Sequence, residues 1–417
     1  MRSLSCLAGV IFVLSAAPAI AQQLPDGPGK AILELRCSMC HGVDQVLSGG
    51  GRSPDEWSDV VHQMIDLGAN VSGEEMPTLV EYLAKSFPLK KEAPAAAAPA
   101  PTSDTPVTTG NTPVTFKEWE VPTPSSRPHD PLAAADGSIW YTGMNANVLG
   151  RLDPKTQQFK EFKLKTPDSG PHGLTEDKAG NIWFTANTKG YVGKLDPRTG
   201  EISEFPMPDP AARDPHTPVF DQKGDLWFTI QAGNKIGRLN PASGQLTLRD
   251  SPTARSLPYG IVVSSKGAPF YVEFGTNKVA TINPDTMVIR EWTLPNAGAR
   301  PRRLAIDAQD VIWYSDYARG YLGRLDPATG NVKEWASPGG PQSQPYGIAV
   351  INGTVWYSES GVEPNTLVRF DPATEKFQTW KIPSGGGVVR NVSVTKDGNL
   401  ALAESGVNKI ALVEIGK

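Results

Sequence analysis

One pattern of apolar and polar positions repeats through the C-terminal part of the chain. An aromatic triplet recurs about every 43 residues, and a Gly-basic-Leu-Asp/Asn-Pro segment follows most of its copies. Short strands separated by turn residues at such a period are typical of the blades of a β-propeller. The triplets, which predict seven blades, are Trp140-Tyr-Thr, Trp183-Phe-Thr, Trp227-Phe-Thr, Phe270-Tyr-Val, Trp313-Tyr-Ser, Trp356-Tyr-Ser and the degenerate Leu400-Ala-Leu.

The seventh repeat reaches Lys417 without the outer strand that the other repeats possess. The segment from Val114 to Val121 has the pattern of those outer strands, of which Phe159-Lys-Glu-Phe162 is one example. We therefore expect residues 114–121 to complete the last blade and close the ring, which removes the exposed sheet edges. The predicted all-β propeller spans residues 114–417.

The N-terminal part shows the spacing of amphipathic helices instead. Ser53 and Pro54 mark a helix start, after which apolar residues recur on one face as far as Ile65. Ser72 and Glu75 indicate the start of another helix. We predict a small all-α domain at residues 22–87, with three helices around a cofactor. Residues 88–113 are rich in Pro, Ala, Thr and Ser, which predicts a linker.

The first 21 residues have the organisation of a signal peptide. Arg2 precedes an apolar run from Leu7 to Ala17, and Ala19-Ile20-Ala21 is the small-x-small pattern that signal peptidase cleaves. The apolar run is too short to cross a bilayer, and no later stretch is long enough. We therefore expect a periplasmic protein with no membrane span.

Two cysteines follow the predicted signal peptide, and a histidine adjoins the second. In Cys37-Ser-Met-Cys40-His41 the two thiols can attach to the haem vinyl groups, while the adjacent imidazole ligates the iron. A disulfide or a redox dithiol would not require that histidine, and no βαβ context of a thioredoxin-like site surrounds it. The motif predicts one covalently bound haem c with His41 as an iron ligand.

The second axial ligand is expected from Met64, Met76 or His62, which all lie within reach along the chain. The segment resembles the short cytochrome c domains attached to periplasmic dehydrogenases, through the Val-Val-x-x-Met and Tyr-Leu-Ala elements at Val60 to Met64 and Tyr82 to Ala84. The resemblance implies Met64 as the ligand. Thioether ligation raises the reduction potential of haem, which suits electron transfer.

Composition narrows the choice of partners. The chain has 40 basic and 44 acidic residues, a formal net charge of −4, and its basic residues are spread along the sequence. Binding to a phosphate backbone requires a clustered Lys/Arg footprint. A nucleic-acid partner is therefore excluded.

Aligning the repeats places one residue per blade at the start of its first strand. First strands line the channel of a propeller, so these side chains should form one ring. The ring positions are His129, His172, His216, Tyr259, Arg302, Tyr346 and Arg390, and they include each histidine of the repeats. A second set of positions lies about fourteen residues further on: Gly143, Ala186, Ile230, Glu273, Asp316, Glu359 and Glu404.

The polar side chains of both sets are candidates for catalysis or binding. Clustered imidazoles suit a metal ion or proton transfer, and arginines opposed to carboxylates suit an acidic or zwitterionic small molecule. A divalent metal or a quinone cofactor at the funnel is one interpretation. The other is that the ring position simply prefers a polar group at a wet channel mouth.

Residues 114–417 resemble the streptogramin lyases, the virginiamycin B lyase family. The resemblance rests on repeated Pro-His-Gly, Trp-Phe-Thr and Asn-Lys-Ile-Gly-Arg-Leu motifs, the last at Asn234 to Leu239. It implies a seven-bladed propeller that opens a cyclic depsipeptide by elimination, with a magnesium ion and a histidine base at the funnel. The family pattern pairs a ring histidine with a glutamate fourteen residues on, and no blade of this chain has both.

Three functions follow from these features. The leading hypothesis is a periplasmic redox protein, in which a substrate or partner binds at the funnel and electrons pass through the haem to or from another cytochrome. The alternative is a streptogramin-type lyase with an altered active site. It ranks second because an elimination needs no electron carrier, so the haem would have no role in it. The third hypothesis is a non-catalytic propeller module that binds a partner beside a tethered cytochrome.

Overall fold

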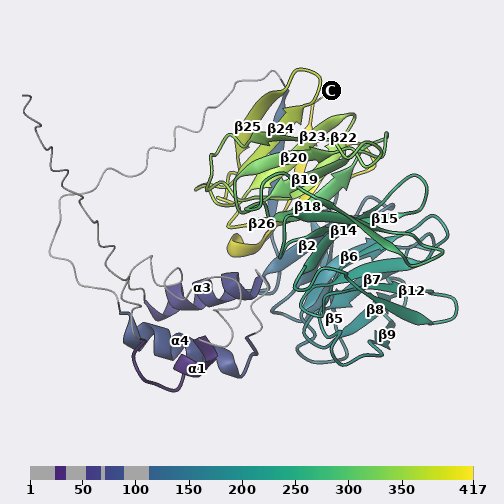
Figure 1. Cartoon of the computed structure of the whole chain (residues 1–417). Helices are drawn as coiled ribbons and strands as arrows, with labels where there is room; N and C mark the ends of the chain where they lie inside the picture. Colours follow the sequence, from purple (N-terminus) through teal and green to yellow (C-terminus); the bar gives the residue numbers. More distant parts are fainter. Residues whose placement is uncertain (1–23, 34–52, 67–70, 89–111, 417) are drawn as a thin grey trace, which may run out of the picture. The chain divides into compact units, whose positions relative to one another are not determined.

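The computed structural model describes residues 24–33, 53–66, 71–88 and 112–416 (Figure 1). The predicted signal peptide and the haem motif at Cys37, Cys40 and His41 lie outside the described residues. The chain divides into two compact units, Met1–Ala96 and Ala97–Lys417. No helix among the residues with described structure is long and apolar enough to cross a membrane.

The N-terminal unit contains the helices α1 (Lys30–Ile32), α3 (Pro54–Asp66) and α4 (Glu75–Ser86). Trp57, Leu79 and Leu83 are fully buried in its apolar core. The predicted helix start at Ser72 is present, because the Ser72 amide donates to the Glu75 carboxylate (2.9 Å) and the Glu75 amide donates to Ser72 Oγ (3.2 Å). That this helical unit is a cytochrome c domain stays a prediction.

The second unit confirms the predicted seven-bladed propeller. Each blade is a four-stranded antiparallel sheet. The first three blades consist of β2 (Pro128–Ala133), β3 (Ile139–Gly143), β4 (Val148–Asp153) and β5 (Gln158–Lys163); β6 (Pro171–Glu176), β7 (Ile182–Ala186), β8 (Tyr191–Leu195) and β9 (Ile202–Pro206); and β10 (Pro215–Phe220), β11 (Leu226–Ile230), β12 (Lys235–Leu239) and β13 (Leu246–Asp250).

The next three blades repeat this order. They consist of β14 (Pro258–Val263), β15 (Pro269–Glu273), β16 (Lys278–Ile282) and β17 (Ile289–Thr293); β18 (Pro301–Ile306), β19 (Ile312–Asp316), β20 (Tyr321–Leu325) and β21 (Val332–Ala336); and β22 (Pro345–Ile351), β23 (Thr354–Glu359), β24 (Thr366–Asp371) and β25 (Lys376–Lys381).

The last blade joins the two ends of the propeller sequence. It contains β26 (Val389–Val394), β27 (Leu400–Glu404) and β28 (Lys409–Ile415), with the short 3-10 helix η2 (Ser405–Val407) between the last two, and β1 (Val114–Glu120) is its outer strand. β1 pairs with β28 along its whole length, from Val114 opposite Ile415 to Glu120 opposite Lys409. This pairing closes the ring.

The aromatic triplets form the second strands, which are buried on both faces between neighbouring blades. The glycine of the Gly-basic-Leu motif lies opposite the aromatic ring: a Cβ on Gly237 would stand 2.2 Å from Cζ of Phe228. The motif therefore makes room for the ring. The first strands of successive blades contact one another in a closed circuit, from β2 through β6, β10, β14, β18 and β22 to β26 and back to β2.

Candidate functional site

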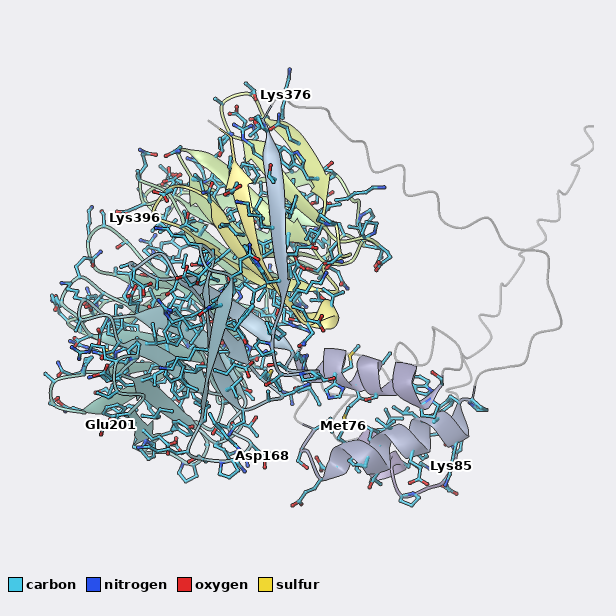
Figure 2. The ribbon with its side chains drawn as sticks, turned by 180° about the vertical axis from the view of Figure 1, so that it is seen from behind. Met76, Lys85, Asp168, Glu201, Lys376 and Lys396 are labelled. Atoms are coloured by element: carbon cyan, nitrogen blue, oxygen red, sulfur yellow. The ribbon has the colours of Figure 1, made fainter. Side chains whose placement is uncertain are left out.

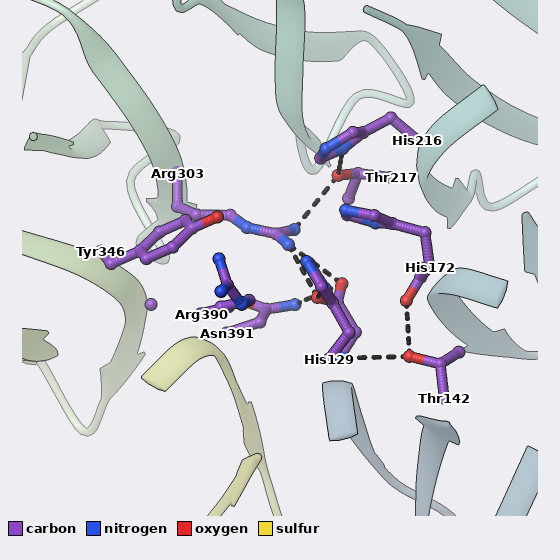
Figure 3. A network of polar contacts seen from close by, with 12 residues as sticks. His129, Thr142, His172, His216, Thr217, Arg303, Tyr346, Arg390 and Asn391 are labelled. Carbon is purple, nitrogen blue, oxygen red and sulfur yellow. Dashed lines mark hydrogen bonds and ion pairs between the residues drawn. The ribbon is translucent and has the colours of Figure 1, made fainter. Parts of the chain in front are cut away.

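The ring residues of the first four blades contact one another in turn, with planes tilted by 45–53°. Figure 3 shows the three histidines among them. The ring centroids of His129 and His172 are 3.8 Å apart, those of His172 and His216 3.8 Å, and those of His216 and Tyr259 3.9 Å. The three histidines that the sequence aligned are thus in direct contact.

The last residue of the aromatic triplet holds this arrangement in place. Thr142 Oγ1 accepts a hydrogen bond from the Asp130 amide (3.1 Å) and donates one to the carbonyl of His172 in the next blade (2.8 Å). Thr185 repeats both bonds, to the Gly173 amide and the His216 carbonyl. Each threonine hydroxyl therefore links the first strand of its own blade to the ring residue of the next blade.

Arg302 occupies an aromatic enclosure on the other side of the ring. Its guanidinium carbon lies 4.0 Å from the ring centroid of Tyr346 and 4.3 Å from that of Tyr317, with Tyr259 and Phe274 at 5.0 and 4.9 Å. The Tyr259 and Tyr346 hydroxyls are 2.5 Å apart, and Arg302 Nη2 donates to Tyr259 (3.2 Å). Cation–π contacts and this hydrogen bond compensate for the burial of its charge.

A second polar cluster, which we call the axial cluster, consists of Asp130, Thr217, Arg303 and Asn391. Arg303 Nη2 donates to both Asp130 oxygens (2.8 and 3.1 Å), and Arg303 Nη1 donates to Thr217 Oγ1 (3.1 Å). Asn391 Nδ2 donates to Asp130 Oδ2 (3.0 Å). These bonds join four blades across the propeller axis.

Sequence reasoning missed the axial cluster, although the repeat register contains a signal for it. Its residues directly follow the ring positions in blades one, three, five and seven, while blades two, four and six have glycine there. A Cβ on Gly347 would stand 2.8 Å from the backbone carbonyl carbon of Asn391. Four of the seven blades thus place a side chain at the axis, and two of these, blades seven and one, are neighbours.

The ring is buried, which corrects the expectation of a wet channel mouth. Its seven side chains are between 0 and 7% exposed. Burial is the main cause that lowers the pKa of His129, His172 and His216 well below 6.5, and the positive charge of Arg390 adds to the effect at His129. The three imidazoles are therefore neutral at pH 7.

Two imidazole nitrogens in this centre have no hydrogen-bond partner. His129 Nδ1 is 2.9 Å from Asp130 Oδ1, but His129 Nε2 is buried and unpartnered, as is His172 Nδ1. His216 differs, because its Nδ1 is 2.9 Å from Thr217 Oγ1. Unsatisfied buried polar atoms are costly, so these two mark a place where a ligand could contribute a bond.

The four acids that lie fourteen residues after ring positions do not point toward the ring residues. Glu273 pairs directly with Pro258, so it shares the strand face of Pro258 and not that of the ring residue Tyr259. Each of the four acids accepts bonds from the loop that leads into its own blade: Ser251 to Glu273, the Arg300 amide to Asp316, Ser337 and the Gly339 amide to Glu359, and Ser384 to Glu404. The structure does not bring these acids together with the histidines.

Two of these acids are strongly perturbed. Burial, followed by the charge of Glu291, raises the pKa of Glu273 to about 7. Burial, followed by the charge of Glu118, raises the pKa of Glu404 to about 7. Asp316 differs because Arg319 Nε donates to it at 2.6 Å, although burial still raises its pKa.

The magnesium ion implied by the family resemblance does not fit this centre. Within the described part of the chain, one group of side chains has metal-ligand spacing: His129, Asp130 and His172, whose candidate ligand atoms lie within 4.8 Å of one another. Magnesium prefers an octahedron of oxygen ligands, whereas this group offers two nitrogens. Its one carboxylate already accepts from Arg303 and Asn391.

The candidate haem ligands on the helices differ in their packing. Met76 on α4, labelled in Figure 2, packs against the apolar core of the helical unit. Met64 is half-buried on α3. His62 Nδ1 is 2.8 Å from the Ser58 carbonyl, within the same helix. The choice of the axial ligand and the haem itself stay predictions.

Seven closed blades around a buried polar centre define a seven-bladed β-propeller. Residues 104–363 match the virginiamycin B lyase family, and the chain belongs to that family. No curated protein matches the chain.

Solved structures agree on the fold. A streptogramin B lyase is 28% identical, with a TM-score of 0.67 over 73% of this chain and 98% of that one. Virginiamycin B lyase from Staphylococcus aureus is 23% identical, with a TM-score of 0.66 over 72% of this chain and 99% of that one. Hydrazine synthase from Kuenenia stuttgartiensis, 12% identical with a TM-score of 0.59 over 70% of this chain and 97% of that one, shares the fold alone.

Proposed function

We propose that this chain is an exported electron-transfer protein, in which a haem c on the N-terminal unit exchanges electrons with a partner cytochrome. The propeller then serves as the module that binds a substrate or the partner. One observation carries the proposal: Cys37-Ser-Met-Cys40-His41 combines two thiols and an imidazole in the order that covalent haem attachment requires.

The described helices support this proposal. They form a compact apolar core around Trp57, Leu79 and Leu83, against which a porphyrin can pack. Residues 88–113, which are rich in Pro, Ala, Thr and Ser and cannot form an apolar core, then act as the linker between this unit and the propeller.

A lyase is the second candidate, and the family match over residues 104–363 favours it. A solved virginiamycin B lyase from Staphylococcus aureus, in a catalytically inactive form, contains quinupristin. The centre of this propeller argues against the same reaction here. The acids at Glu273, Asp316, Glu359 and Glu404 bond to blade loops, so they are not placed beside the ring histidines.

The test of the proposal is haem attachment in the full chain. We expect protein exported by a host that matures c-type cytochromes to contain one haem, which survives denaturing extraction and shows a pyridine haemochrome spectrum. Cys40→Ser should weaken attachment, and His41→Ala should change the iron spectrum, whereas the matched control Ser38→Ala should do neither. Exported chain without any covalent haem would contradict the proposal.

A further inference from the structure

Blade seven differs from the other six blades because its strands do not follow one another in the sequence. β1 comes from the start of the propeller sequence and pairs with β28 from its end. In Figure 2 this blue strand lies among the yellow strands of the same blade. In each other blade a short turn attaches the outer strand to the strand that it pairs with. β1 has no such turn, so the contacts of the strand itself keep it in the sheet.

Two carboxyl groups meet in this blade. Glu118 on β1 lies opposite Ala411 on β28, and Glu404 on β27 lies opposite Lys409, also on β28. Ser384 contacts both acids: its amide donates to Glu118 Oε1 (3.1 Å), and its hydroxyl donates to Glu404 Oε2 (2.8 Å). One residue therefore bonds to both carboxyl groups, which places them side by side across the strand that closes the ring.

The second oxygen of Glu404 indicates where a proton is held. Glu404 is fully buried, and within the part of the chain that the structure describes its Oε1 accepts no hydrogen bond. A proton on Glu404 makes the carboxyl group a donor, and the neighbouring Glu118 carboxylate can accept the bond. Burial, followed by the Glu118 charge, raises the pKa of Glu404 to about 7. The two acids therefore share one proton at neutral pH and below.

Blade five shows how a basic side chain makes such a proton unnecessary. Arg319 donates to both acids of that blade, to Asp316 and to Glu334, at 2.6 Å each. In blade seven Lys409 Nζ lies 3.6 Å from Glu118 Oε2, beyond hydrogen-bond distance. The positive charge in blade seven thus does not bridge the two acids, and loss of the shared proton leaves two negative charges in contact.

The other strands packed against β27 direct their charged groups elsewhere. Glu404 lies opposite Val389 on β26, so the adjacent Arg390 points to the other face of the sheet. β2 also packs against β27, and its titratable residues belong to the centre of the propeller: His129 and Asp130. The charges that act on Glu404 are those of Glu118 and Lys409.

We propose that Glu404 and Glu118 form a pH-sensitive latch, which holds β1 in the last blade while they share a proton and releases β1 when the proton is lost. Because Glu404 loses its proton as the pH rises through 7, the latch is closed at lower pH and opens at higher pH. β1 directly follows residues 88–113, so its release lengthens the segment between the two units. The latch does not depend on haem, so this proposal and the electron-transfer proposal can fail separately.

The experiment is hydrogen–deuterium exchange of the full mature chain at pH 6 and pH 8, with each rate divided by the intrinsic exchange rate at that pH. We expect the corrected exchange of the β1 amides to be about three- to tenfold faster at pH 8, because a group that titrates near 7 in the closed state and near 4.5 in the open state shifts the opening equilibrium by that factor. The outer strand β21 of blade five, where Arg319 bridges the acids, should show no such acceleration.

Three variants separate the latch from a general loss of stability. Glu404→Gln removes the titrating group and should abolish the acceleration of β1, and Glu118→Gln, which removes the opposing charge, should reduce it. Glu414→Gln removes a half-exposed carboxylate beside Lys117 from the same pair of strands and should leave the acceleration unchanged. Exchange of β1 that does not respond to pH in the parent chain would overturn the proposal. So would equal acceleration of β1 and β21, or an acceleration that persists in Glu404→Gln.

Discussion

Arg303 on β18 and Asp130 on β2 form an ion pair across the axis of the propeller, with 2.8 Å between Nη2 and Oδ1. The two residues are 173 positions apart in sequence, and both are almost fully buried. Thr217 and Asn391 bond to the same pair, so blades one, three, five and seven are tied at their centre.

Removing one partner of this pair should destabilise the propeller strongly. Asp130→Asn leaves the Arg303 guanidinium buried without its counter-charge, and we expect the free energy of unfolding to fall by about 3–5 kcal/mol. Adding Arg303→Met to that variant should recover most of the loss, because both charges of this pair are then removed. Denaturant unfolding measures both. A loss below about 1 kcal/mol in the single variant would contradict the role given to the pair.

The neutral histidines should make stability depend on pH. Their native pKa values lie below the ordinary value of 6.5, so below pH 6.5 the unfolded chain binds more protons than the folded chain, and stability falls with acidification. The slope that each histidine contributes approaches about 1.4 kcal/mol per pH unit as the pH falls below 6.5. Unfolding of His172→Gln between pH 7.5 and 5.5 should therefore show an average slope smaller by about half a proton. An unchanged slope would show that His172 takes up its proton in the native state as it does in the unfolded chain.

Glu404 should act in the opposite direction. Its native pKa of about 7 lies above the ordinary 4.5, so its protonated form contributes stability that is complete below pH 4.5 and is lost as pH rises through 7. Glu404→Gln removes the charge and should be more stable than the parent at pH 8 by up to about 3 kcal/mol, but not at pH 4.5. Glu414→Gln on β28, half exposed beside Lys117, is the matched control and should change little at either pH. A destabilised Glu404→Gln at pH 8 would refute this account.

The repeat register predicts much of the fold. The period of the aromatic triplets gives the number of blades, and the Ser72–Glu75 pattern marks a helix start that two hydrogen bonds confirm. The register also aligns the ring residues, because equivalent positions in equivalent blades meet at one axis. His129, His172 and His216 lie in contact for that reason.

The centre itself could not be read from the register alone. Which residues meet across the axis depends on the length of their side chains. The Arg303 side chain is long enough to contact Asp130. The glycines at the same position in blades two, four and six, such as Gly347, have no side chain that would obstruct this contact. The spacing of fourteen residues groups Glu273 with Tyr259, but strand alternation turns the two side chains to opposite faces. Spacing along the sequence reports proximity of the backbone and not the direction of a side chain.

The axial ligand of the predicted haem is testable separately. If Met64 ligates the iron, Met64→Ala should lose the spectral signature of thioether ligation, and the reduction potential should fall. Met76→Ala is the matched control, because Met76 packs in the apolar core of the helical unit and should affect stability while leaving the iron spectrum intact. The reverse outcome would assign the ligand to Met76.

The most direct test of the central claim measures two activities on one preparation of the exported full chain. We predict one covalent haem c per chain that cycles between its oxidised and reduced states, and quinupristin that stays intact after prolonged incubation. A ring-opened quinupristin product, formed by chain without covalent haem, would contradict the electron-transfer account and establish the lyase.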